Sequence, residues 1–85
     1  MHVVLHRLFA KSFQKLPHAV QLKFVERRNI FLVDPFSRIL NNHSVDKRFP
    51  GCRSINVTGD YRAIFTITDT HVLFLYIGTH SELYE

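Results

Sequence analysis

The chain has 85 residues, of which 46% are hydrophobic, and its 11 Lys and Arg side chains exceed its 7 Asp and Glu side chains, giving a net charge of +4. With three Gly, three Pro and no low-complexity tract, the composition argues against disorder. The length allows one domain, expected over residues 1–85, with a single small core. The single cysteine, Cys52, excludes an internal disulfide and a cysteine-based zinc framework.

The same features indicate a soluble, cytoplasmic protein. The N-terminal segment is interrupted by His6 and Arg7, so it lacks the apolar core of a signal peptide. The longest apolar stretch, VLFLYIG, is too short to span a bilayer. A net positive charge fits a polyanionic partner, nucleic acid first, although simple solubility explains it equally well.

The first half of the chain has the pattern of a strand followed by a helical hairpin. Residues 2–6 have high β-propensity, and apolar residues recur at helical spacing over residues 7–16. Pro17 suits the start of a second helix, and the DPF sequence ends that helix after Val33. A short helical turn over residues 36–40 and a polar loop over residues 41–51 follow. The stripe of the second helix that is predicted to share one face holds Val20, Phe24, Arg28 and Phe31.

The second half changes to the period of strands. Residues 52–59 alternate, with Ile55 and Val57 on one face, and residues 61–67 form the next strand. Residues 71–77 are apolar on both faces, which is typical of a strand inside a sheet. The sequence therefore predicts an α+β fold of order β-α-α-β-β-β. Its C-terminal sheet is antiparallel, with the helical hairpin packed on one face.

The segment IGTHSELYE places His80 and Tyr84 four residues apart, just after the last predicted strand. A histidine in a polar loop at a strand end can be accessible and can transfer protons near neutral pH. The alternative is that His80 is one of six inert histidines. Tyr84 either stacks on a nucleic-acid base or anchors this segment to the core, and the sequence leaves both open.

Arg62 and Asp60 lie near a predicted turn. Arg62 could clamp a phosphate with its guanidinium group, or could form a weak surface ion pair with Asp60 or Glu82. Asp60 is a turn residue by default, and the alternative is that it orients a histidine or exchanges protons with it.

The predicted loop concentrates cationic side chains, interrupted by Phe49 and Pro50. Such a loop either contacts phosphates or is a solvated charge run. No metal-binding or Gly-rich phosphate motif occurs, and Cys52 has no activating neighbour except Arg53, so we expect no metal and no cofactor. The residues expected to contact RNA are Lys47, Arg48, Arg53 and Tyr61, and His43 adds a further potential cation to the loop.

These groups suit cleavage of an RNA phosphodiester without a metal. One group takes the proton from the 2′-OH, Arg or Lys neutralises the charge of the phosphorane, and another group protonates the leaving 5′-oxygen. Composition alone does not establish this activity.

Residues 40–84, with the motifs GDYR and GTHSELY, resemble the C-terminal half of bacterial type II toxin–antitoxin toxins of the RelE/ParE superfamily, nearest the YafQ-like and RelE-like mRNA interferases. Over residues 7–35 the resemblance is weaker. It implies a microbial RNase fold, cleavage of mRNA at the ribosomal A site, inhibition of translation, and neutralisation by a cognate antitoxin. It also implies that operator DNA is contacted only through the antitoxin complex, and it implies no membrane.

The resemblance also implies roles for individual residues. His80 matches the main acid/base of the GTH motif, and Tyr84 matches the aromatic residue that ends it. His43 matches a central-loop histidine, and Asp60 matches the acid that precedes an aromatic residue. Arg62 matches the strand arginine that holds phosphate in RelE-like members.

Two positions depart from the YafQ-like pattern. Asn56 stands where that pattern has a second histidine, and Tyr76 stands where it has an arginine. The acid/base inventory is therefore one histidine short. A ParE-like toxin that inhibits DNA gyrase without being a nuclease remains the alternative, although the retained His80 argues against it. A plain nucleic-acid-binding module is a third possibility.

Overall fold

The computed structural model describes residues 1–84 and places the elements in the predicted order, with two short additions. No helix in this part of the chain is both long and apolar enough to cross a membrane. The elements are β1 (His2–Leu5), α1 (Arg7–Gln14), α2 (His18–Val33), the 3₁₀ helix η1 (Arg38–Leu40), β2 (His43–Ser44), β3 (Arg53–Asn56), β4 (Tyr61–Ile67), β5 (His71–Thr79) and α3 (His80–Tyr84).

The additions, β2 and α3, both correct the sequence prediction. β2 lies inside the segment 41–51, which the sequence predicts as a loop. Its two residues form a strand because they pair with β3 at the edge of the sheet. α3 forms where the sequence predicts a polar loop after the last strand, so His80 is the first residue of a helix.

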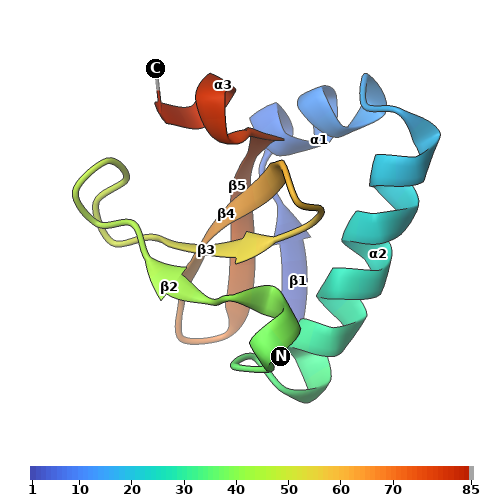
Figure 1. Cartoon of the computed structure of the whole chain (residues 1–85). Helices are drawn as coiled ribbons and strands as arrows, with labels where there is room; N and C mark the ends of the chain where they lie inside the picture. The colour runs from blue at the N-terminus through green and yellow to red at the C-terminus, as the bar shows by residue number, and fades with distance from the viewer. Residues whose placement is uncertain (85) are drawn as a thin grey trace.

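The sheet has five strands in the order β1-β5-β4-β3-β2. β3, β4 and β5 form the predicted antiparallel meander, and β5 is an interior strand, as its two apolar faces indicate. β1 pairs parallel to β5, so the sheet is mixed. Because α1 and α2 cover one of its faces (Figure 1), the predicted α+β class is confirmed. We call the opposite side of the sheet the open face.

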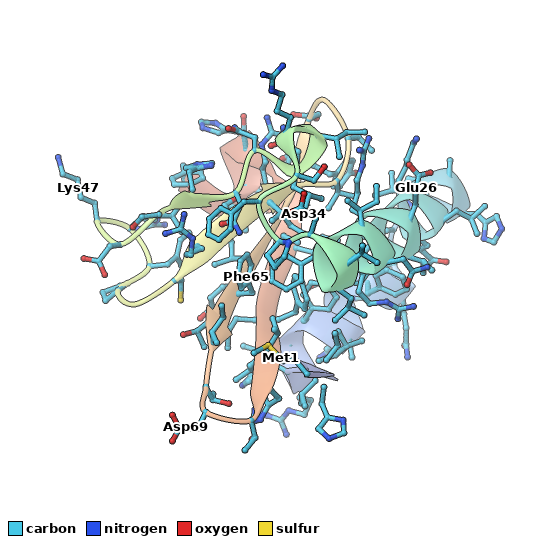
Figure 2. The ribbon with its side chains drawn as sticks, turned by 90° about the horizontal axis from the view of Figure 1, so that it is seen from below. Met1, Glu26, Asp34, Lys47, Phe65 and Asp69 are labelled. Atoms are coloured by element: carbon cyan, nitrogen blue, oxygen red, sulfur yellow. The ribbon has the colours of Figure 1, made fainter. Side chains whose placement is uncertain are left out.

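Phe74 of β5 is the centre of the core between the sheet and the helices. Its ring centroid lies 5.7 Å from that of Phe9, 5.2 Å from Phe24, 6.3 Å from Phe31 and 5.5 Å from Phe65, and each of these five side chains is at most 2% exposed. Figure 2 shows Phe65 inside the molecule. Burial of Phe24 and Phe31 confirms the predicted face of α2, and the aromatic contacts hold both helices on the sheet.

β5 contains one residue more than β4 along their pairing. Ile64 pairs with Tyr76, but the next residue of β4, Phe65, pairs with Phe74, which leaves Leu75 as the extra residue of a β-bulge. A bulge changes the direction in which the following side chains point.

The bulge reverses the alternation of side chains along β5. Before it, Val72 and Phe74 are buried against the helices; after it, Ile77 is the residue that joins that core. Tyr76 and Gly78 therefore lie on the open face, where an unbroken alternation would have put them beside Phe74.

A second, smaller apolar cluster lies on the open face. It fastens two segments to the sheet, the 45–52 loop and α3. The cluster consists of buried Val45, Cys52 and Ile64, with Phe49, Leu75, Leu83 and Tyr84 packed against them. The predicted polar loop is thus anchored by apolar side chains in its interior.

α3 begins with a reciprocal pair of hydrogen bonds. The amide of Thr79 donates to Glu82 Oε1 at 2.8 Å, and the amide of Glu82 donates to Thr79 Oγ1 at 3.2 Å, which is a capping box. The bonds to the Thr79 backbone and side chain lower the pKa of Glu82 below its ordinary value of 4.5. A Cβ at Gly78 would meet Glu82 Oε1 at 3.3 Å, so a glycine there lets α3 pack close to the strand.

The central position of Phe74 predicts a large stability loss on truncation. Phe74→Ala should lower the free energy of unfolding by about 3–5 kcal/mol. Ile67→Ala, at a side chain that is 51% exposed in the same ladder, should cost less than about 1 kcal/mol. Urea unfolding followed by circular dichroism measures both, and equal losses would contradict the central role of Phe74.

The capping box makes the start of α3 sensitive to acid. Because folding lowers the pKa of Glu82, its ionised form stabilises α3 above pH 4.5, and this contribution is lost as the pH falls through the lower, folded value. The NMR shift of the Thr79 amide should therefore titrate with a midpoint below pH 4.5. Glu82→Gln, which keeps the acceptor, should abolish that transition. A midpoint at or above 4.5 in the wild type would contradict the cap.

Candidate active site

A hollow of about 480 Å³ opens between β2, the 45–52 loop and α3. Its lining unites segments from the middle and the C-terminal part of the chain, and it includes five of the residues that the sequence singles out. The lining residues are His43, Ser44, Val45, Asp46, Lys47, Arg48, His80 and Tyr84.

His80 and Tyr84 lie one turn apart on α3 with their rings stacked, the centroids 4.7 Å apart and the planes at 25°. The His80 amide donates to the Asp60 carbonyl oxygen at 3.1 Å, which fixes the first residue of the helix. Within residues 1–84, neither ring nitrogen of His80 makes a hydrogen bond, and the side chain is exposed. The stacking therefore orients the imidazole and leaves both nitrogens accessible to a substrate.

Tyr84 itself is half-buried. Its ring meets Phe49 edge-on, with the centroids 5.9 Å apart, and it packs against the open-face cluster. Of the two roles open from the sequence, the geometry supports the anchor, with the added role of supporting the His80 ring.

His43 faces the same hollow from β2. Its Nδ1 lies 2.7 Å from the Asn41 carbonyl oxygen. A carbonyl oxygen only accepts, so Nδ1 carries a proton, and in the neutral tautomer that this hydrogen bond selects the lone pair lies on Nε2. Asn41 has a φ of 46°, a left-handed conformation that asparagine tolerates, and this turn sets the position of the carbonyl.

Lys47 and Arg48 supply the positive charge of the hollow. Figure 2 shows Lys47 extending from the tip of its loop, on the opposite side of the molecule from Glu26 of α2. The Arg48 Nε donates to the Leu83 carbonyl oxygen at 3.2 Å, which links the loop to α3. The carboxylate of the neighbouring Asp46 accepts the Gly51 amide at 2.7 Å and so braces the loop.

Asp60 and Arg62 lie beside the hollow but outside its lining. Arg62 Nη1 donates to the carbonyl oxygens of Thr58 and Gly59 at 2.9 and 3.2 Å, which closes the β3–β4 turn. Among the described residues it forms no ion pair with Asp60 or Glu82, the surface pairing that the sequence left open. Asp60 is exposed and reaches α3 through its backbone carbonyl. Asp60 therefore holds the backbone of His80, and Arg62 holds the turn that contains Asp60.

Arg53 and Tyr61 are not part of the lining of the hollow. The Arg53 Nε donates to Asn42 Oδ1 at 2.7 Å, and its guanidinium carbon lies 5.4 Å from the centroid of Phe36. Tyr61 packs against the core on the helix side of the sheet. Because neither side chain lines the hollow, the geometry does not favour the RNA contact that the sequence predicts for them, which stays untested.

The sequence did not predict that Phe49 and Tyr76 lie together beside the hollow. Their ring centroids are 5.2 Å apart on the open face. Phe49 stood in the sequence only as an interruption of a charge run, and Tyr76 only as a departure from a family pattern. No marker in the sequence reveals the bulge that brings them together.

Cys52 is buried, and burial, followed by the charge of Asp46, raises the pKa of its thiol. This disfavours the reactive thiolate. In the part of the chain that the structure describes, no group of three or more His, Cys, Asp or Glu side chains is arranged to hold a metal ion.

No protein-family model matches the sequence, and no curated protein matches it by sequence. Solved structures do match. YafQ from E. coli superposes with a TM-score of 0.74 at 21% identity, covering 98% of this chain and 97% of that one. The YoeB/ParE toxin from Agrobacterium tumefaciens gives 0.79 at 13% identity, covering 94% and 99%. The archaeal RelE–RelB complex from Pyrococcus horikoshii gives 0.72 at 25% identity, covering 92% of each chain. The chain therefore has the fold of the RelE/ParE superfamily of toxins, with YafQ and RelE among its structural neighbours.

Proposed function

We propose that this protein is the toxin of a type II toxin–antitoxin system and acts as a metal-independent endoribonuclease. As an mRNA interferase, it would cleave mRNA at the ribosomal A site and so inhibit translation in the cytoplasm. The observation that carries the proposal is the hollow in which two histidines, His43 and His80, meet the cations Lys47 and Arg48. The shared fold with RelE-type toxins supports it.

The two histidines suit the two proton transfers of RNA cleavage. The neutral His43, with its lone pair on Nε2, takes the proton of the 2′-OH as that oxygen attacks the adjacent phosphorus. The protonated His80 donates to the 5′-oxygen as the P–O bond breaks. The products are a 2′,3′-cyclic phosphate and a 5′-OH. His43 and His80 together supply both proton transfers, so the proposed reaction does not require a histidine at the position of Asn56.

The remaining predicted residues stabilise charge or position the histidines. Lys47 and Arg48 neutralise the charge that develops on the phosphorane. Tyr84 holds the His80 ring by stacking, and Asp60 holds the His80 backbone. Arg62 acts as a positioning residue by closing the turn that carries Asp60.

A cognate antitoxin is the expected protein partner. The RelE neighbour is described in complex with RelB, and an antitoxin that covers the cationic hollow would block access of RNA. Operator DNA would be contacted only through the antitoxin complex.

The acid/base assignment predicts that His80→Ala abolishes toxicity. Loss of a positioned proton donor should lower cleavage by at least about 100-fold. Growth and mRNA integrity after induction measure this in cells, with folding checked by circular dichroism. His18→Ala is the matched control, because His18 is exposed at the start of α2, away from the hollow.

The same experiment tests the gyrase alternative. If folded His80→Ala arrests growth as strongly as the wild type while messages stay intact, the ribonuclease assignment fails. DNA gyrase then becomes the first target to examine.

The placement of cations predicts unequal effects of two charge removals. Lys47→Ala should lower the slope of log affinity against log salt by about 0.7 for single-stranded RNA. Arg53→Ala removes the same charge outside the hollow and should leave the slope unchanged. Titration of a 2′-O-methyl oligoribonucleotide at several salt concentrations gives both slopes. An equal decrease for Arg53→Ala would show that RNA also contacts that side chain.

A further inference from the structure

A second hollow, of about 500 Å³, adjoins the first on the open face. Arg48 lines both, so the two hollows share a wall. The second is lined by Arg48, Phe49, Pro50, Cys52, Leu75 and Tyr76. Of its lining residues, only Arg48 takes part in the cleavage described above.

A row of four rings connects the two hollows. His80 stacks on Tyr84, Tyr84 meets Phe49 edge-on, and Phe49 lies against Tyr76, with centroid distances of 4.7, 5.9 and 5.2 Å. The row begins at the candidate acid and ends at Tyr76, which is 37% exposed. The bulge at Leu75 is what brings Tyr76 to this face.

The chemistry of this hollow matches that of a platform for single-stranded nucleic acid. Such platforms combine an exposed aromatic face, on which a base stacks, with cations that follow the phosphate backbone. Tyr76 provides the ring, and Phe49 supports it from within the open-face cluster. The Arg48 guanidinium, 5.7 Å from the Phe49 centroid, places positive charge between the two hollows.

We propose that the second hollow is a base-stacking subsite for single-stranded RNA. The base of the nucleotide next to the cleaved one stacks on Tyr76, and the phosphate that links the two nucleotides passes Arg48. This proposal rests on the proposed function, and it adds how the substrate is held. Because every base has a π face, the subsite raises affinity for RNA without selecting a base.

The chain contains no tryptophan, so Tyr76→Trp creates a single fluorescent reporter at the subsite. A short 2′-O-methyl oligoribonucleotide serves as a probe that cannot be cleaved. We expect the probe to quench the tryptophan fluorescence of this variant, and the same probe with abasic nucleotides to quench it far less. Phe36→Trp is the matched control, since Phe36 is an exposed ring beside Arg53 that lines neither hollow, and its fluorescence should not change.

Affinity provides the second readout. Tyr76→Ala should weaken binding of the probe about tenfold, and Tyr76→Phe, which keeps the ring, should bind as the wild type does. Circular dichroism shows whether Tyr76→Ala is folded. If it is not, the quenching of Tyr76→Trp fluorescence alone tests the subsite.

Two kinds of failure are distinguishable. If the probe binds but Tyr76→Trp is not quenched, or if folded Tyr76→Ala binds as tightly as the wild type, the subsite is overturned while the ribonuclease assignment stands. If the wild type binds no probe and His80→Ala remains toxic, both the proposed function and the subsite fall.

Discussion

The pairing of β4 with β5 has to satisfy two apolar clusters at once, one on each face of the sheet. Phe74 and Ile77 both belong to the helix-side core, although they are three positions apart and would lie on opposite faces of a regular strand. The extra residue Leu75 resolves this conflict by shifting the register. Everything beyond it, including Tyr76 and the entry into α3, takes its orientation from that shift.

The two faces of the sheet differ in what they hold: the main core lies on one and the candidate site on the other. On the helix side, tightly packed phenylalanines around Phe74 provide the cohesion of the fold. On the open face, a smaller cluster holds the 45–52 loop and α3, and polar groups lie along its rim. Ser54 Oγ and Asn56 Oδ1, on the open side of β3, are buried without a hydrogen-bond partner among residues 1–84. Each such group costs about 1–3 kcal/mol. Two more, Arg27 Nη1 and Arg28 Nε, lie on α2, so both sides of the sheet carry this cost.

Sequence patterns predicted most of the fold and part of the site. Periodicity identified the helices and the meander. The same alternation puts Arg53 on the helix side of β3, because it lies two residues from Ile55, which is buried there. Thr79 and Glu82 have the spacing of a capping box, so α3 was predictable as well. The bulge was not, since it arises from pairing between strands rather than from either strand alone. For that reason the shared position of Phe49 and Tyr76 had to come from the structure.

The parallel pairing of β1 with β5 has a consequence for the order of events during synthesis. His2 pairs with His71, so the sheet joins segments from nearly opposite ends of the described chain. β1 is synthesised long before β5, its partner strand. His43 is likewise synthesised before His80, the histidine that shares its hollow. Contacts between such distant segments form late in folding. The hollow therefore cannot form until residues 80–84, which supply part of its lining, have been synthesised.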